Sequence, residues 1–311
     1  RMLARLQSWR QYATWCREAH KIASELVASE EYDLGHHVTY STWRQISPLS
    51  NLGIPWVLGP VGGGESFPTA FSGCLSLQSR LFEMAREASS RLAMRSAKLR
   101  RSIRSANFVL ASTPETVTLV RRMGVAPERT ALVPAIFLHA DRIKLFKSCR
   151  PKHHSPHLRI FAGGSLEGRK GVALALRALA ALVSRGVAFK FTFAGSGSEL
   201  SHLETQAAAL SLDPSRILFR DSLPLDQYIQ TLQNSDVYLL PSLRDSGGLT
   251  LGEAMLAGCV PIVIRAGGPG LLVTTDCGYA FEPDSPEHIV EQMTNALQTL
   301  STNEGHRLQL S

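Results

Sequence analysis

The chain has 311 residues, of which 44% are apolar and 19% charged, which is enough for two domains of ordinary size. No apolar run approaches the eighteen or so residues that cross a membrane. The five cysteines are scattered without a C-x-x-C pair, which argues against a zinc site or a disulfide framework and favours a reducing cytoplasm.

The first half of the sequence predicts a parallel α/β domain. Apolar residues at helical spacing predict a helix over residues 1–30. A further helix begins at Pro114, because proline is favoured in the first turn. Short β-rich runs predict strands, and strands that alternate with helices indicate a parallel sheet. These strands are expected at residues 33–40, 54–61, 107–112 and 129–136.

A long basic helix is predicted over residues 80–104, where eight arginines and lysines outnumber Glu83 and Glu87 and leucines are interleaved. A basic amphipathic helix can lie on anionic lipid. The same pattern also fits the solvated face of a surface helix. Nucleic-acid binding is a weaker interpretation, because no recognition motif accompanies the charge.

The polar, proline-bearing segment 147–157 is predicted to link two domains, an N-terminal domain over residues 1–150 and a C-terminal domain over 151–311. Three histidines in this segment could bind a metal, but a linker offers no ordered scaffold for them. We therefore interpret them as solvated; they are His153, His154 and His157.

The second domain repeats the strand–helix alternation, with helices ending at Ser184, spanning residues 249–256 and starting at Ser285. Its strands are expected at residues 159–162, 189–194, 217–219, 237–240, 259–264 and 278–281. Both halves of the chain are thus predicted to be parallel α/β domains.

A candidate anion site precedes the helix over residues 249–256. Gly247 and Gly248 leave backbone N–H groups bare at the positive end of the helix dipole, which favours a phosphate. Asp245 lies in the loop and Glu253 about one turn inside the helix. Because carboxylates repel phosphate, these two are better suited to accept hydrogen bonds from sugar hydroxyls.

This stretch resembles the signature of the retaining glycosyltransferases of group 1, family 4, which have the GT-B fold. That signature is an acid, seven residues, Glu-Ala-Met and then a strand of the Gly-x-Pro-Val type, here Asp245, Glu253, Met255, Gly258 and Pro261. The resemblance implies two Rossmann-like domains that face a cleft, with an incomplete N-terminal domain. A tight crossover turn without a ligand is the alternative interpretation.

The resemblance also implies roles for individual residues. The family's G-R-L-x-x-x-K-G element matches at Lys170, which would neutralise the nucleotide diphosphate, but its arginine is replaced by Ser165, so Arg169 could substitute. Asp245 would face the transferred sugar, and Glu253 would hold the ribose hydroxyls. Further donor contacts are expected from Arg169, Gly195, Gly197, Ser246, Gly247, Gly248 and Leu249, and N-terminal ones from Gly62, Gly63 and Gly64.

Two further features depart from the family pattern. The histidine that often follows the N-terminal strand ending at Val61 is missing. His36 and His37 are weaker candidates, and either could equally be a packed or capping residue. The first strand and glycine loop of the family have no counterpart, so we expect a fragment that lacks the start of its N-terminal domain.

The implied activity is transfer of a sugar, with retention, from a nucleotide-diphosphate donor to a glycan, a lipid-linked saccharide or another hydroxyl acceptor in bacterial polysaccharide or glycoconjugate synthesis. No metal motif is present and Lys170 with a helix N-terminus can replace a divalent ion, so no cofactor is expected. The expected location is the cytoplasm, or the inner face of the cytoplasmic membrane. The alternatives are a sugar-nucleotide epimerase of GT-B fold and a non-catalytic nucleotide-sugar-binding module. A dehydrogenase is disfavoured, because Leu200 replaces the last glycine of G-x-G-x-x-G.

Overall fold

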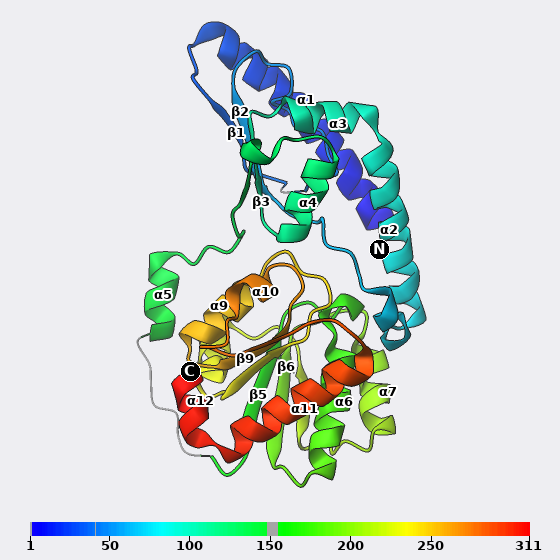
Figure 1. Cartoon of the computed structure of the whole chain (residues 1–311), viewed down its shortest axis with the longest axis vertical. Helices are drawn as coiled ribbons and strands as arrows, with labels where there is room; N and C mark the ends of the chain where they lie inside the picture. The colour runs from blue at the N-terminus through cyan, green and yellow to red at the C-terminus, as the bar shows by residue number, and fades with distance from the viewer. Residues whose placement is uncertain (1, 41, 148–154) are drawn as a thin grey trace. The chain divides into compact units, whose positions relative to one another are not determined.

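The computed structural model describes residues 2–40, 42–147 and 155–311 (Figure 1). The chain forms two compact units. Unit 1 contains Arg1–Glu65 and Arg86–Ala135, and unit 2 contains Ser66–Ala85 and Ile136–Ser311. The predicted boundary between residues 150 and 151 lies outside the described residues and stays a prediction.

Unit 1 is built on a parallel four-stranded sheet in the order β1-β2-β3-β4. Its core is formed by buried side chains of the sheet, the helices and the connecting loops, among them Trp43, Trp56 and Val109. The strands are β1 (Gly35–His37), β2 (Trp56–Val61), β3 (Phe108–Ala111) and β4 (Thr130–Leu132), and the helices are α1 (Met2–Ser29), α3 (Ala97–Ser105), α4 (Pro114–Arg122) and the 3-10 turn η2 (Pro127–Arg129).

The predicted basic helix over residues 80–104 is two helices, α2 (Leu77–Arg95) and α3. Ser96 separates them because its backbone is extended and its side chain accepts a hydrogen bond from the backbone N–H of Leu99. That contact satisfies one of the free donors in the first turn of α3, as an N-cap does. The prediction of one continuous helix was therefore wrong at Ser96.

Unit 2 is built on a parallel six-stranded sheet in the order β10-β9-β8-β5-β6-β7. One face packs against α6, α7 and α11 through a large apolar core, and the other packs against α5, α8 and α9. The strands are β5 (Leu158–Gly163), β6 (Phe189–Ala194), β7 (Ile217–Arg220), β8 (Val237–Leu240), β9 (Val260–Ile264) and β10 (Tyr279–Phe281). The helices are α5 (Ala140–Lys147), η3 (Gly168–Lys170), α6 (Val172–Ser184), α7 (Leu200–Ala209), α8 (Leu225–Gln233), α9 (Leu249–Leu256), α10 (Pro269–Leu272), α11 (Pro286–Thr302) and α12 (Glu304–Leu310).

A segment of the N-terminal half belongs to unit 2. It contains the 3-10 helix η1 (Thr69–Cys74) and the first turns of α2. Phe71 is fully buried in the core formed by β5, β6, α6 and α11. In the part of the chain that the structure describes, no helix is long and apolar enough to cross a membrane.

Candidate active site

The candidate site is set by two neighbouring strands of unit 2. β5 pairs with β8 in parallel, with Ile160 opposite Val237, although the two strands are far apart in the sequence. The loops that follow the carboxyl ends of these strands therefore meet at one edge of the sheet. One loop carries Arg169 and Lys170, and the other carries Asp245.

Lys170 and Asp245 form a nearly buried ion pair. The Nζ of Lys170 lies 2.5 Å from Oδ2 of Asp245, and the two side chains are 13% and 14% exposed. Arg169 supports the pair, since its guanidinium lies 3.9 Å from the same oxygen and donates to the carbonyl of Arg244 at 3.1 Å. Burial alone would raise the pKa of Asp245, but Lys170, Arg169 and the backbone N–H of Gly247 hold it below its usual value.

Gly171 allows the two loops to approach this closely. Its φ of +67° lies in the left-handed region, and a Cβ there would collide with the carbonyl of Pro241 at the end of β8. Any other residue would have to shift one loop away from the other. The glycine therefore fixes Lys170 beside Asp245.

The predicted glycines of the loop after β6, Gly195 and Gly197, allow that loop to pack closely against the loop after β5. A Cβ at Gly195 would meet the carbonyl of Gly164, and one at Gly197 would meet the carbonyl of Leu166. The backbone N–H of Leu166 donates to the carbonyl of Ser196 at 2.9 Å. Gly195 and Gly197 thus hold the loop that carries Lys170, and a direct donor contact stays a prediction.

The loop before α9 folds around Asp245. The backbone N–H of Gly247 donates to Oδ1 of Asp245 at 3.2 Å, and that of Gly268 donates to the Asp245 carbonyl at 2.8 Å. Gly248 precedes the first residue of α9, Leu249, whose side chain is half exposed. The predicted loop residues, including Ser246, therefore lie at the N-terminus of α9 as expected.

Glu253 is buried, because it is only 2% exposed, and its predicted contact with the ribose stays a prediction. Its Oε1 accepts from Nε and Nη2 of Arg142 at 2.8 and 2.7 Å, and its Oε2 accepts from the hydroxyl of Tyr228 at 2.8 Å. Burial raises the pKa of Tyr228, which keeps the phenol protonated as a donor. Glu253 is therefore bonded to α5 and α8, not to the Lys170–Asp245 pair.

A second buried ion pair anchors the Asp245 loop to α2. Arg244 donates from Nε and Nη2 to the two carboxylate oxygens of Glu83 at 3.0 and 2.7 Å, and both side chains are about one-tenth exposed. The carboxylate of Glu199, in the loop after β6, accepts from the hydroxyls of Ser76 and Ser79 at 2.5 and 2.6 Å. The segment 66–85 thus holds two of the site loops.

Sequence patterns alone predicted no role at this site for Arg142, Tyr228, Glu83 or Arg244. Their partners lie in distant parts of the chain: Arg142 lies 111 residues before Glu253, and Glu83 lies 161 residues before Arg244. No local spacing could have revealed these pairs.

The glycines at residues 62–64 belong to unit 1, where they follow β2. The carbonyl of Gly63 accepts from the indole of Trp43 at 2.9 Å and from Arg86 at 3.0 Å. The backbone N–H of Gly64 donates to the hydroxyl of Thr116 at 3.1 Å. This loop is therefore a fixed structure, and its contact with a ligand remains a prediction.

The two histidine candidates, His36 and His37, contact other residues of unit 1. A ring nitrogen of His36 lies 2.8 Å from the carbonyl of Gly59, and His37 is 7% exposed and stacked on Trp15. Burial lowers the pKa of His37, which favours its neutral form. Among the described residues, which include His157 but not His153 or His154, no cluster of three His, Cys, Asp or Glu could hold a metal.

Unit 2 also has a groove of about 540 Å³ between α8 and the strands β6 and β7. Cationic and amide side chains line it, including Lys190, Arg220 and Gln227. None of the three predicted catalytic residues contributes to its lining, so the groove is separate from the candidate site.

Comparison with known proteins places these features in a family. The model of the glycosyl transferases group 1 family matches residues 150–307. A sulfoquinovosyl transferase of Arabidopsis thaliana is 26% identical over 170 residues, or 51% of this chain and 32% of that protein. The amylovoran biosynthesis glycosyltransferase AmsK of Erwinia amylovora is 28% identical over 193 residues, or 60% of this chain and 42% of that protein. The chain thus spans less than half the length of these curated relatives.

Solved structures agree on the fold. HepE of Anabaena, crystallised with UDP and glucose, superposes with a TM-score of 0.61 at 18% identity over 96% of this chain and 75% of that one. The lipopolysaccharide outer core galactosyltransferase WaaB gives 0.60 at 14% identity over 92% and 72%. The predicted α/β class of GT-B type is confirmed. Because the family model covers residues 150–307, half of the sequence, the chain belongs to the group 1 glycosyl transferases.

Proposed function

We propose that this protein transfers a sugar from a nucleotide-diphosphate donor to a hydroxyl acceptor, with retention at the anomeric carbon as in family 4. The observation that carries the proposal is the Lys170–Asp245 pair, which two strand-end loops bring together in front of the N-terminus of α9. The UDP and glucose in the related HepE structure support a donor of this class.

Lys170 and Asp245 are suited to opposite parts of such a donor. In the reaction, the bond between the anomeric carbon and the phosphate oxygen breaks, a bond to the acceptor oxygen forms, and the acceptor proton leaves with the diphosphate. Lys170 and the amides before α9 would stabilise the charge that develops on that diphosphate. A diphosphate that binds Lys170 also frees Asp245 to accept a hydrogen bond from a sugar hydroxyl.

Glu253 would accept hydrogen bonds from the ribose, but only after a rearrangement. The carboxylate is 2% exposed and both of its oxygens are already bonded. Tyr228 lies against the core of unit 2, whereas one third of the Arg142 side chain is exposed. Arg142 is therefore the partner that a ribose would displace.

The acceptor is proposed to be a glycan or a lipid-linked saccharide, in keeping with relatives such as AmsK. The reaction is proposed to need no metal, because Lys170 and the helix N-terminus supply the positive charge. The proposed setting is bacterial polysaccharide or glycoconjugate synthesis in the cytoplasm. Contact with an anionic membrane would involve a surface other than the donor site.

The test is release of nucleotide from UDP- and GDP-sugars by the full-length protein, together with calorimetric titration of UDP and GDP. We expect turnover with an acceptor, and we expect Glu253→Ala to weaken nucleotide binding about tenfold or more, with loss of two charge-assisted contacts. Glu253→Gln serves as a milder variant, and thermal unfolding checks that both remain folded.

Each outcome has a separate meaning. Unchanged nucleotide affinity in both Glu253 variants would show that Glu253 does not contact the ribose. Binding without turnover would indicate a binding module, and free sugar released without an acceptor would indicate an epimerase. No binding of either nucleotide would overturn the proposed function as a whole.

A further inference from the structure

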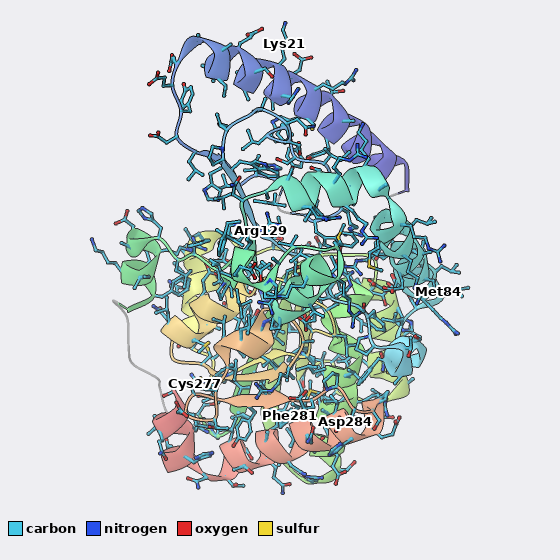
Figure 2. The ribbon with its side chains drawn as sticks, turned by 45° about the horizontal axis from the view of Figure 1, so that its top comes forward. Lys21, Met84, Arg129, Cys277, Phe281 and Asp284 are labelled. Carbon is cyan, nitrogen blue, oxygen red and sulfur yellow. The ribbon has the colours of Figure 1, made fainter. Side chains whose placement is uncertain are left out.

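The helix α2 presents apolar side chains to solvent along one face. Four large residues lie on this face at a spacing of four, three and eight positions, which places them in one row of a helix. Their exposed fractions are 74% for Leu77, 57% for Leu81, 61% for Met84 and 66% for Leu92. Met84 lies on the solvent side of α2 in Figure 2.

The opposite face of α2 buries a row of polar side chains, beside Ala93 and Met94, which pack against the core of unit 1. Ser79, Glu83, Arg86 and Ser90 are each 8–9% exposed. Ser79 donates to Glu199, and Glu83 accepts from Arg244. Arg86 donates to the carbonyl of Gly63, and the hydroxyl of Ser90 accepts from Arg44 at 3.4 Å. The spacing of four, three and four shows that these residues also form a single row.

This arrangement is the reverse of an ordinary surface helix, which buries its apolar row and exposes its polar one. Exposing an apolar row to water is unfavourable, so the reversal does not stabilise a helix whose outer side faces water. Contiguous exposed apolar rows on soluble proteins mark contacts with other molecules. The outer row of α2 is therefore a binding face.

The charge around this face indicates the kind of partner. Arg80, Arg91 and Arg95 are exposed on α2. A second copy of the chain would bring the same positive charges to the contact, and like charges at close range repel. An anionic lipid surface satisfies both the apolar row and the arginines.

We propose that α2 is an interfacial helix that lies in the headgroup layer of an anionic bilayer. Leu77, Leu81, Met84 and Leu92 enter the acyl boundary, and the arginines contact lipid phosphates. The polar inner row meanwhile holds the helix on the protein. This contact is independent of the donor assignment, and it would keep the protein at the surface where lipid-linked acceptors reside.

The test is co-sedimentation of the full-length protein with vesicles of phosphatidylcholine containing about one third phosphatidylglycerol, and with pure phosphatidylcholine vesicles. We expect binding to the anionic vesicles that weakens with salt. The double variant Leu81→Ser/Met84→Ser should bind at least about tenfold more weakly, because it removes apolar area from the lipid contact.

A matched control replaces two similarly exposed apolar residues elsewhere in the chain, Val38→Ser/Leu308→Ser, whose side chains are each 56% exposed. This control should bind vesicles like the wild type. The charge variant Arg80→Gln/Arg91→Gln should lose most of its preference for anionic over neutral vesicles. Circular dichroism should show the native fold in every variant.

Three results would overturn the proposal: no binding of the wild type to anionic vesicles, equal binding by the Leu81→Ser/Met84→Ser variant, or a lipid-free dimer that this variant converts to a monomer. The last result would assign the face to a second copy of the chain. None of these results bears on the affinity for nucleotide, which is measured separately. Failure of the membrane proposal is therefore distinct from failure of the proposed transfer reaction.

Discussion

The two residues that meet at the end of β5 and β8 are each placed by a glycine. Gly171 brings Lys170 close to β8, and Gly247 donates to the side chain of Asp245. The sequence could predict that Lys170, Asp245 and the loop glycines belong to one site, because their spacing follows a known signature. It could not predict the ion pair between them, which depends on the order of strands in the sheet.

Replacement of Lys170 by methionine should destabilise the protein by about 2 kcal/mol at neutral pH, because it leaves a buried carboxylate without its cation. In the wild type the pKa of Asp245 is lowered, so the pair's contribution is complete above the unfolded pKa of about 3.9 and is lost as pH falls through the folded pKa. Without Lys170, burial raises this pKa. The difference between wild type and variant should therefore shrink towards pH 2.

Urea unfolding at pH 7 and at low pH measures this effect. Lys144→Met is the matched control, since the Lys144 side chain is 80% exposed and lies 3.8 Å from Asp141. It should leave the free energy of unfolding unchanged at both pH values. A Lys170→Met penalty that is the same at both would show that the ion pair does not depend on the ionisation of Asp245.

The helices and strands of this chain were largely predictable, because their apolar residues recur at clear helical or strand spacing. The strand over residues 189–194 and the helix over 249–256 have the predicted bounds. The helix break at Ser96 was not predicted, since serine is also tolerated within helices. The burial of the polar row of α2 could not be predicted either. The helical periodicity of the sequence shows that there is one apolar and one polar row, but not which of them is buried.

The inner row of α2 provides a prediction for the element. Glu83→Gln should lower the free energy of unfolding by about 3 kcal/mol, because Arg244 is left buried without an anionic partner. It should also reduce nucleotide-sugar turnover, since Arg244 adjoins Asp245. Urea unfolding and the turnover assay measure the two effects.

Glu87→Gln on the same helix is the control, because the Arg91–Glu87 pair is mostly exposed at 70% and 34%. Its effect should stay below about 0.5 kcal/mol. If the two variants proved equally stable, the Glu83–Arg244 pair would not anchor the loop in solution.

At the scale of the whole molecule, the alternation of strands and helices was sufficient to predict two parallel sheets, since each crossover needs a helix. The membership of residues 66–85 in unit 2 could not be predicted. Phe71 gives no local sign that it enters the core of a sheet whose first strand begins 87 residues later at Leu158.

Phe71→Ala should therefore destabilise unit 2, by about 3–5 kcal/mol for a fully buried phenylalanine. All four tryptophans belong to unit 1, at Trp9, Trp15, Trp43 and Trp56. In urea, the circular dichroism transition should shift to lower concentration, while the tryptophan fluorescence transition should shift less.

Phe137→Ala, at a side chain that is 72% exposed in the same unit, should shift neither signal. Equal shifts of the dichroism and the fluorescence after Phe71→Ala would contradict two separately cooperative units. Absence of any shift would show that residues 66–85 do not pack on unit 2.

The reversed faces of α2 also have a practical consequence for anyone who prepares this protein. Without a lipid surface, the exposed row of Leu77, Leu81, Met84 and Leu92 favours self-association, and the repulsion between the surrounding arginines opposes it. High salt screens that repulsion, so concentrated stocks should precipitate in high-salt buffers and stay clear at low ionic strength or with a mild detergent.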